Sequence, residues 1–164
     1  MHKDITTLFV DFLKEIGIGV SFKSITEPTI VPGVTIQKGS VVIDQEQLLY
    51  PGDILHEAGH IAVMPPEIRP TLDGTLNDCD LHRGGELMAI AWSYAACIHL
   101  KIDPHIVFHE FGYKDSGANL VDNFQKKQFV GVSTLQWCGM TNDPTSNKDL
   151  SLPMFPIMKS WLRP

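Results

Sequence analysis

The chain has 164 residues, 43% of them hydrophobic and 20% charged, which is the size and composition of one globular domain with a single core. Its net charge of −6 and its scattered lysines and arginines argue against nucleic-acid binding, and no apolar run approaches the ~20 residues of a membrane-spanning helix. The three cysteines form no C-x-x-C pair, so a reducing cytoplasm fits better than a disulfide framework. We therefore expect one cytoplasmic domain over residues 1–164, with neither nucleic acid nor a membrane as partner.

The N-terminal part of the chain predicts one helix followed by a small β-sheet. Apolar residues recur at helical spacing over residues 4–16, which indicates an amphipathic helix. Residues 18–24 carry the signals of a short strand. Val34–Gln37 and Val41–Asp44 predict a β-hairpin, because the turn between them, Lys38-Gly39-Ser40, contains glycine. The hairpin leads into a largely apolar helix that carries the most informative residues of the chain.

The C-terminal part is expected to be mainly helical. Residues 67–83 are polar and rich in turn formers, which predicts a long loop of the kind that often carries function. The helical segments expected after it are Glu86–Leu100, a short turn from Asp103 to about His109, Ser116–Lys127 and Pro153–Leu162. Residues 129–140 are ambiguous between strand and helix. Most aromatic residues are expected in the core: Trp92, Trp137, Trp161, Phe108, Phe111, Phe124, Phe129 and Phe155.

The five residues from His56 to His60, His-Glu-Ala-Gly-His, match the pattern H-E-x-x-H. Residues four apart lie on one face of a helix, so His56 and His60 can place imidazole nitrogens on one metal ion. Glu57 projects to the side, where it can reach a water molecule on the metal instead of the metal itself. A mostly apolar helix needs partners for these polar groups, and a metal ion supplies one. The pattern therefore predicts a Zn²⁺ site with Glu57 as the general base.

Catalytic zinc usually takes three protein ligands, so a third one is needed. A third histidine at the spacing H-E-x-x-H-x-x-G-x-x-H is excluded, because Val63 and Pro66 occupy the two later positions. Glu86 is the preferred ligand: it begins the next expected helix, just after Gly84-Gly85, where two glycines allow a close approach.

Other metal-binding residues are weaker candidates. Asp80 and His82, in the preceding loop, remain alternatives for the third ligand, and Cys79 in the same loop is a weaker one. His105 and His109 are four residues apart, so they could form a second metal-binding pair on one helical face. His99 lies in an apolar helix and is interpreted as an ordinary packing or surface residue.

With these residues assembled, the chain resembles the gluzincin class of zinc metallopeptidases and, more narrowly, minimal zincins of the ImmA/IrrE-like kind. In those proteins a helix and a small sheet precede H-E-x-x-H, and the glutamate ligand opens a helix of the form E-x-x-A-x-x-aromatic-small. Here that stretch runs from Glu86 through Ala89 and Trp92 to Ser93, and the resemblance covers residues 34–100. It implies an α+β, zincin-like fold: a small sheet or hairpin packed on the H-E-x-x-H helix and on the glutamate helix, with further C-terminal helices.

The chain also departs from this pattern. The larger thermolysin-type enzymes carry an acid shortly after the glutamate ligand, where this chain has Ile90 and Ala91. Residues that orient the ligands must therefore come from elsewhere. Residues 101–164 match no pattern that we can name.

The residues and the resemblance lead to one hypothesis. Zinc held by His56, His60 and Glu86 would lower the pKa of its bound water from about 16 toward ~7, and Glu57 would pass that proton to the leaving amine. The substrate would be a peptide or protein, held by strand addition along the hairpin edge. Candidates for the donor that stabilises the oxyanion are Tyr94, Tyr113, His82, Arg83 and His109. Two alternatives stay open: a non-enzymatic zinc-binding or interaction protein on the same scaffold, and a zinc hydrolase of a non-peptide amide or ester.

Overall fold

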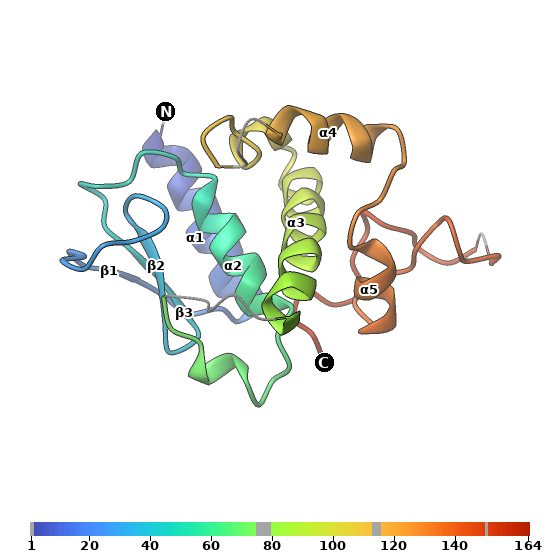
Figure 1. The fold of residues 1–164 in the computed structure, drawn as a ribbon, viewed down its shortest axis with the longest axis horizontal. Coiled ribbons are helices and arrows are strands. Elements are labelled where there is room, and N and C mark those ends of the chain that lie inside the picture. Colours follow the sequence, from blue (N-terminus) through green and yellow to red (C-terminus); the bar gives the residue numbers. More distant parts are fainter. Residues whose placement is uncertain (1, 75–79, 113–115, 150) are drawn as a thin grey trace.

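The computed structural model describes residues 2–74, 80–112, 116–149 and 151–164, and only the backbone of residues 2–4 and 80–83. This described part is an α+β fold in which helices pack on a small sheet (Figure 1). Its elements are α1 (His2–Ile16), β1 (Val20–Phe22), β2 (Val34–Gln37), β3 (Ser40–Ile43), α2 (Asp53–Ala62), η1 (Arg69–Thr71), α3 (Asp80–Leu100), η2 (Pro104–Ile106), α4 (Gly117–Gln125) and α5 (Val132–Trp137).

The three-stranded sheet has the order β1-β3-β2, with β1 parallel and β2 antiparallel to the central strand. The predicted hairpin is confirmed, with Val34 opposite Ile43 and Gln37 opposite Ser40. Its turn is shorter than expected, because Ser40 already belongs to β3. Lys38 and Gly39 both have positive φ, 48° and 70°, which is the two-residue turn that matches the twist of a hairpin.

Helix α2 lies between the sheet and α3, so both of its sides are buried (Figure 1). Ile54, Leu55 and Ile61 have no exposed surface, and they pack with apolar residues of β2, β3 and α1. The burial of these side chains removes apolar area from water and fixes the rotation of α2 about its axis. The polar residues of the motif are therefore held on one defined face.

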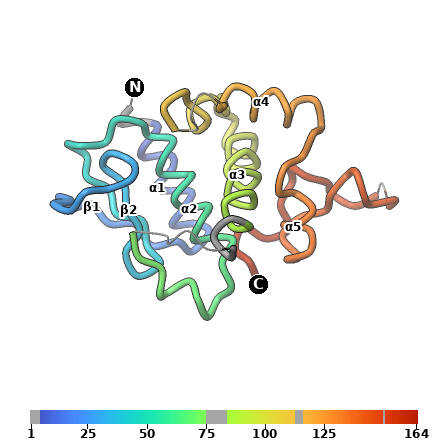
Figure 2. Tube along the Cα trace, viewed as in Figure 1, coloured from blue at the N-terminus to red at the C-terminus, as the bar shows by residue number. Residues whose placement is uncertain are grey.

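The C-terminal end of α2 is joined by hydrogen bonds to distant parts of the chain. The backbone N–H of Arg163 donates to the carbonyl of Ala62, 2.9 Å away, and the Arg69 guanidinium donates to the carbonyls of Met64 and Arg163. These bonds satisfy carbonyls that a helix end leaves without intrahelical donors. Figure 2 shows the C-terminal end of the trace lying near the C-terminal end of α2. The Trp92 indole adds a bond to the carbonyl of Trp161, at 2.8 Å.

The structure corrects several predicted helix limits. Helix α3 begins at Asp80, so the loop expected up to residue 83 is partly helical. The ambiguous segment 129–140 contains α5, which follows Gly131 in the left-handed conformation. Only Pro104–Ile106 of the turn expected to reach His109 is helical, as a 3₁₀ turn.

The helix expected over Pro153–Leu162 is not formed. Pro153 and Pro156 have no N–H to donate. The N–H of Phe155 donates to the carbonyl of Asn142 and that of Lys159 to Met140, at 2.8 and 2.9 Å. Tertiary partners therefore take the backbone bonds that a helix would have used.

The core contains most of the expected aromatic residues, with two exceptions. Trp92, Phe108, Phe124 and Phe155 are buried as expected, and Phe129 and Trp161 pack partly against them. Trp137 is 81% exposed and Phe111 is 71% exposed, so the prediction is wrong for both. Trp137 ends a six-residue helix whose Leu135 faces the core, and residues two apart on a helix point to different sides. None of the helices in the described ranges is both long and apolar enough to cross a membrane.

Candidate metal centre

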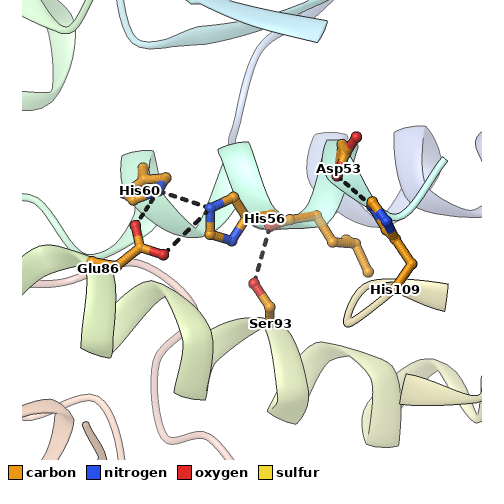
Figure 3. A network of polar contacts seen from close by, with 7 residues as sticks. Asp53, His56, His60, Glu86, Ser93 and His109 are labelled. Carbon is orange, nitrogen blue, oxygen red and sulfur yellow. Dashed lines mark hydrogen bonds and ion pairs between the residues drawn. The ribbon is translucent and has the colours of Figure 1, made fainter. Parts of the chain in front are cut away.

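The predicted ligands come together at the crossing of two helices. His56 and His60 on α2 and Glu86 on α3 point toward one another (Figure 3). The two Nε2 atoms of the histidines are 3.1 Å apart. Glu86 places Oε2 3.0 Å from Nε2 of His60 and Oε1 3.7 Å from Nε2 of His56. Among the described residues, this is the one group of three or more such side chains whose ligand atoms converge.

These spacings fit a tetrahedral zinc ion. Nitrogen and oxygen ligands lie about 2.0–2.1 Å from zinc, so two ligand atoms of one tetrahedron are about 3.3 Å apart. The two separations that involve Nε2 of His60, 3.1 Å to His56 and 3.0 Å to Oε2 of Glu86, lie close to that value, and the 3.7 Å separation from His56 involves the other carboxylate oxygen of Glu86. Within the described part of the chain, two imidazoles and one carboxylate provide three ligands, the number that catalytic zinc sites use. The donor atoms and their geometry therefore fit the ion that the sequence predicts.

Small residues bring the two helices close enough for this geometry. A Cβ atom on Gly59 would lie 3.1 Å from the carbonyl oxygen of Ala89 and 3.2 Å from the hydroxyl of Ser93. The Ser93 hydroxyl donates to the carbonyl of Leu55 across the same contact, at 3.4 Å (Figure 3). The motif glycine therefore sets the separation of α2 and α3, and that separation places Glu86 beside His60.

The surroundings of Glu86 differ in part from the expectation. Glu86 lies in the second turn of α3, because this helix begins at Asp80. The general preference for acidic residues in the first turn of a helix therefore does not account for Glu86 at this position. The close approach expected at Gly84-Gly85 holds only for Gly85, whose Cβ would lie 2.9 Å from Cε of Met64. Nothing lies within 4 Å of a Cβ on Gly84.

The electrostatics of the three ligands favour a positive charge between them. Burial, followed by the charge of His60, lowers the pKa of His56 to about 4. For His60 burial acts against charging, but the hydrogen bond to Glu86 and the charges of Glu57 and Glu86 raise its pKa overall. For Glu86 burial acts to raise the pKa, but the hydrogen bond to His60 and the charges of the two histidines lower it overall. Without a metal these interactions favour a proton on His60, where a cation could replace it.

Glu57 is the fourth polar residue of the site, adjacent to His56 and half-buried. Burial, reinforced by the charges of Asp53 and Glu86 and opposed by that of His60, raises its pKa to about 7. A carboxyl group with such a pKa can both accept and release a proton near neutral pH. A cation at the histidines would lower this pKa, because it favours the charged carboxylate.

An additional pair, which sequence reasoning missed, lies one turn before the motif. Nε2 of His109 is 2.9 Å from Oδ1 of Asp53, and only 5% of the Asp53 side chain is exposed (Figure 3). Asp53 lies in the first turn of α2, where its charge faces the positive end of the helix, and no side chain caps the helix, because the cap position is Gly52. Burial raises the pKa of Asp53, and the bond and charge of His109 partly oppose this rise. The available signal was the position of Asp53, three residues before His56 on the same helical face.

The remaining candidate residues do not join the site or cannot be placed. His105 bonds to Asp103 and His109 to Asp53, so these two histidines do not come together as a metal-binding pair. Tyr94 stacks on Phe124 inside the core, at 4.4 Å. His99 is exposed and contacts the rings of Phe12 and Trp161, as an ordinary packing residue would. Cys79 and Tyr113, and the side chains of Asp80, His82 and Arg83, lie outside the described residues.

Comparisons with models of protein families, with curated proteins and with solved structures find no match for this chain. The class of site therefore rests on its own geometry. That geometry is two imidazoles and a carboxylate at the spacing of metal ligands, with a further carboxyl group of raised pKa beside them. These residues can bind a divalent metal ion and move a proton next to it.

Proposed function

We propose that the chain is a zinc-dependent metallohydrolase with a zincin-like fold, acting as a metallopeptidase. The observation that carries this proposal is the convergence of His56, His60 and Glu86 from two helices, with ligand atoms 3.0 to 3.7 Å apart. A structural zinc site would normally be closed by four ligands. The residues that the structure describes supply three ligands here, next to a half-buried glutamate, and this combination supports a catalytic role over a structural one.

His56, His60 and Glu86 would hold the zinc ion, with both imidazoles neutral and the carboxylate ionised. Zinc in this position supplies Lewis acidity: it acidifies water and polarises a carbonyl group. The low pKa of His56 suits this role, because that imidazole is already neutral at pH 7. A proton on His60, which its raised pKa favours, would have to leave for the metal to bind.

Glu57 would act as the general base and then as the general acid. It accepts one proton from water while the water oxygen forms a bond to the carbonyl carbon of the scissile amide. It then donates that proton to the amide nitrogen while the carbon–nitrogen bond breaks, so the products are a carboxylic acid and an amine. Burial raises the pKa of Glu57 and a bound cation would lower it again, so the two effects act in opposite directions on the proton that this cycle moves.

The substrate would be held at the edge of the sheet. Strand β2 lies at an edge of the sheet, where an extended peptide could add as a further strand. Its turn is already bonded to the segment after η1, since Gly39 donates to the carbonyl of Leu72 and Lys38 to the Asp73 carboxylate. Of the oxyanion donors expected, Tyr94 is in the core and His109 is bonded to Asp53.

The first test is the metal content of protein purified without added metal or chelator. We expect about one zinc per chain in the wild type, a marked loss in Glu86→Ala and no change in the matched control Glu46→Ala, whose side chain is exposed. A wild-type protein that contains no zinc and takes up none on titration would refute the metal site.

The second test separates peptidase activity from the other uses of the same site. Zinc-loaded wild type should cleave members of a peptide library, and Glu57→Gln should retain zinc but lose turnover. Zinc binding without hydrolysis of any peptide, amide or ester would favour a non-enzymatic zinc protein. Cleavage of esters or small amides but not peptides would assign a different hydrolase.

A further inference from the structure

Three stacked rings extend from the N-terminal end of α2 to the protein surface. The ring of Tyr50 lies 4.1 Å from that of His109, nearly parallel at 18°, and 5.6 Å from that of Phe111, at 24°. His109 is bonded to Asp53 at the start of α2, which fixes the inner end of the stack. Phe111 at the outer end is 71% exposed, and Leu49, which precedes Tyr50 in the chain, is 60% exposed. Large apolar side chains gathered at the surface in this way are typical of a binding surface.

The stack stands on a rigid support. A Cβ atom on Gly52 would overlap the carbonyl oxygen of Ile106, so the segment carrying His109 and Phe111 packs directly on the start of α2. Val107 in that segment is fully buried. On the other side, a Cβ on Gly112 would lie 3.0 Å from the His109 ring. The exposed ring of Phe111 is therefore held at a defined place.

The stack lies next to the metal centre along α2. Asp53, His56 and His60 occupy successive turns of one helical face, and a turn advances about 5.4 Å. Figure 3 shows His56 between the Glu86 side of the site and the Asp53–His109 pair. An extended peptide advances about 3.3 Å per residue. A peptide that runs along α2 from the metal centre toward Asp53 would therefore carry its side chains toward the stack.

We propose that Tyr50 and Phe111, together with Leu49, form a subsite for an aromatic or large aliphatic side chain of the substrate. That side chain belongs to the residue two or three positions away from the bond that is cleaved. The inference rests on the proposed peptidase function, and it names the substrate class: peptides with an apolar residue at this distance. An apolar side chain laid on these rings would remove their exposed surface from water, which gives the preference.

The test uses hydroxamates, which bind zinc, as probes of the zinc-loaded protein. Acetohydroxamate reports on the metal alone. Two series of tripeptide hydroxamates, with the hydroxamate at the N-terminal or the C-terminal end, carry Phe or Ser at the residue farthest from the hydroxamate. In the series that binds more tightly, we expect the Kd measured by calorimetry to be about tenfold lower for the Phe probe than for the Ser probe. Phe111→Ala should abolish this preference, and the exposure of Phe111 makes unfolding an improbable cause, which circular dichroism checks. The matched control Phe22→Ala, which removes a half-exposed ring on the edge strand β1, should keep it.

Each result is decisive for a different statement. Equal binding of the Phe and Ser probes by the wild type, or a preference retained in Phe111→Ala, would overturn the subsite while leaving the metal centre intact. A protein that takes up zinc and fails to bind acetohydroxamate would overturn the open metal site, and with it both proposals. Preference lost in both Phe→Ala variants would also count against the subsite, because the effect would not be local.

Discussion

Two glycine-to-alanine substitutions test how closely α2 and α3 approach each other. Gly59 lies in α2 where a Cβ would be 3.1 Å from the carbonyl oxygen of Ala89 and 3.3 Å from its Cα. Gly84 lies in α3 with nothing within 4 Å of the same atom. Both positions are helical, so both variants gain the same helix propensity. The two variants therefore differ mainly in packing.

The magnitudes follow from these contacts. Alanine is favoured over glycine within a helix by about 1 kcal/mol, so Gly84→Ala should stabilise the protein by that amount. At Gly59 the neighbours are backbone atoms of α3, and overpacking of this kind costs about 1–3 kcal/mol. We therefore expect the free energy of unfolding of Gly59→Ala to be about 1–3 kcal/mol lower than that of Gly84→Ala. One kcal/mol corresponds to about 2–4 °C in Tm for a chain of this size.

The assay is urea and thermal unfolding of both variants in chelator, followed by zinc titration of the folded proteins. Because Gly59→Ala separates Glu86 from the two histidines by a few tenths of an ångström, its zinc affinity should fall, and that of Gly84→Ala should not. Equal stabilisation by both substitutions would show that α2 and α3 are not in close contact at Gly59. The account of how Glu86 reaches the site would then fail.

Two further predictions concern protons and the buried pair. Zinc affinity should fall as the pH drops through the raised pKa of His60, by about tenfold per pH unit if one proton is displaced. Zinc titrations between pH 5 and 8 would measure this fall. A zinc affinity that does not change with pH would contradict a proton on His60. His109→Ala should destabilise the protein by about 1–3 kcal/mol in urea unfolding, since it leaves the buried Asp53 carboxylate without its partner. Asp53→Asn should cost less, because burial raises the pKa of Asp53 and so disfavours its charge; a larger loss for Asp53→Asn would reverse this reasoning.

The parts of the structure that could be predicted are those governed by local spacing. The four-residue spacing of His56 and His60 depends only on the helical repeat, and the chain does place both Nε2 atoms together. The hairpin follows from a glycine that can adopt positive φ between two β-branched runs. Glu86 was an inference from the order of elements, and the structure brings it to the two histidines. Whether the site binds zinc and cleaves peptides stays a prediction.

What could not be predicted depends on contacts between residues far apart in the chain. Nothing in the sequence near Asp53 indicates that His109, 56 residues later, will bond to it. The helix expected over Pro153–Leu162 fails for the same reason, because its backbone groups bond to residues 140–142. The exposure of Trp137 and Phe111 was likewise set by which faces the neighbouring elements cover.

The amino-acid sequence by itself determined the residue types of the candidate site and the helix that carries two of its ligands, because hydrogen bonds and side-chain periodicity within a helix are local. Only the tertiary structure decided the separation of α2 and α3, the second-turn position of Glu86 and the pairing of Asp53 with His109. These features depend on how apolar faces pack around one core. That packing is a sum of many weak contacts over the whole chain, and no short stretch of sequence records it.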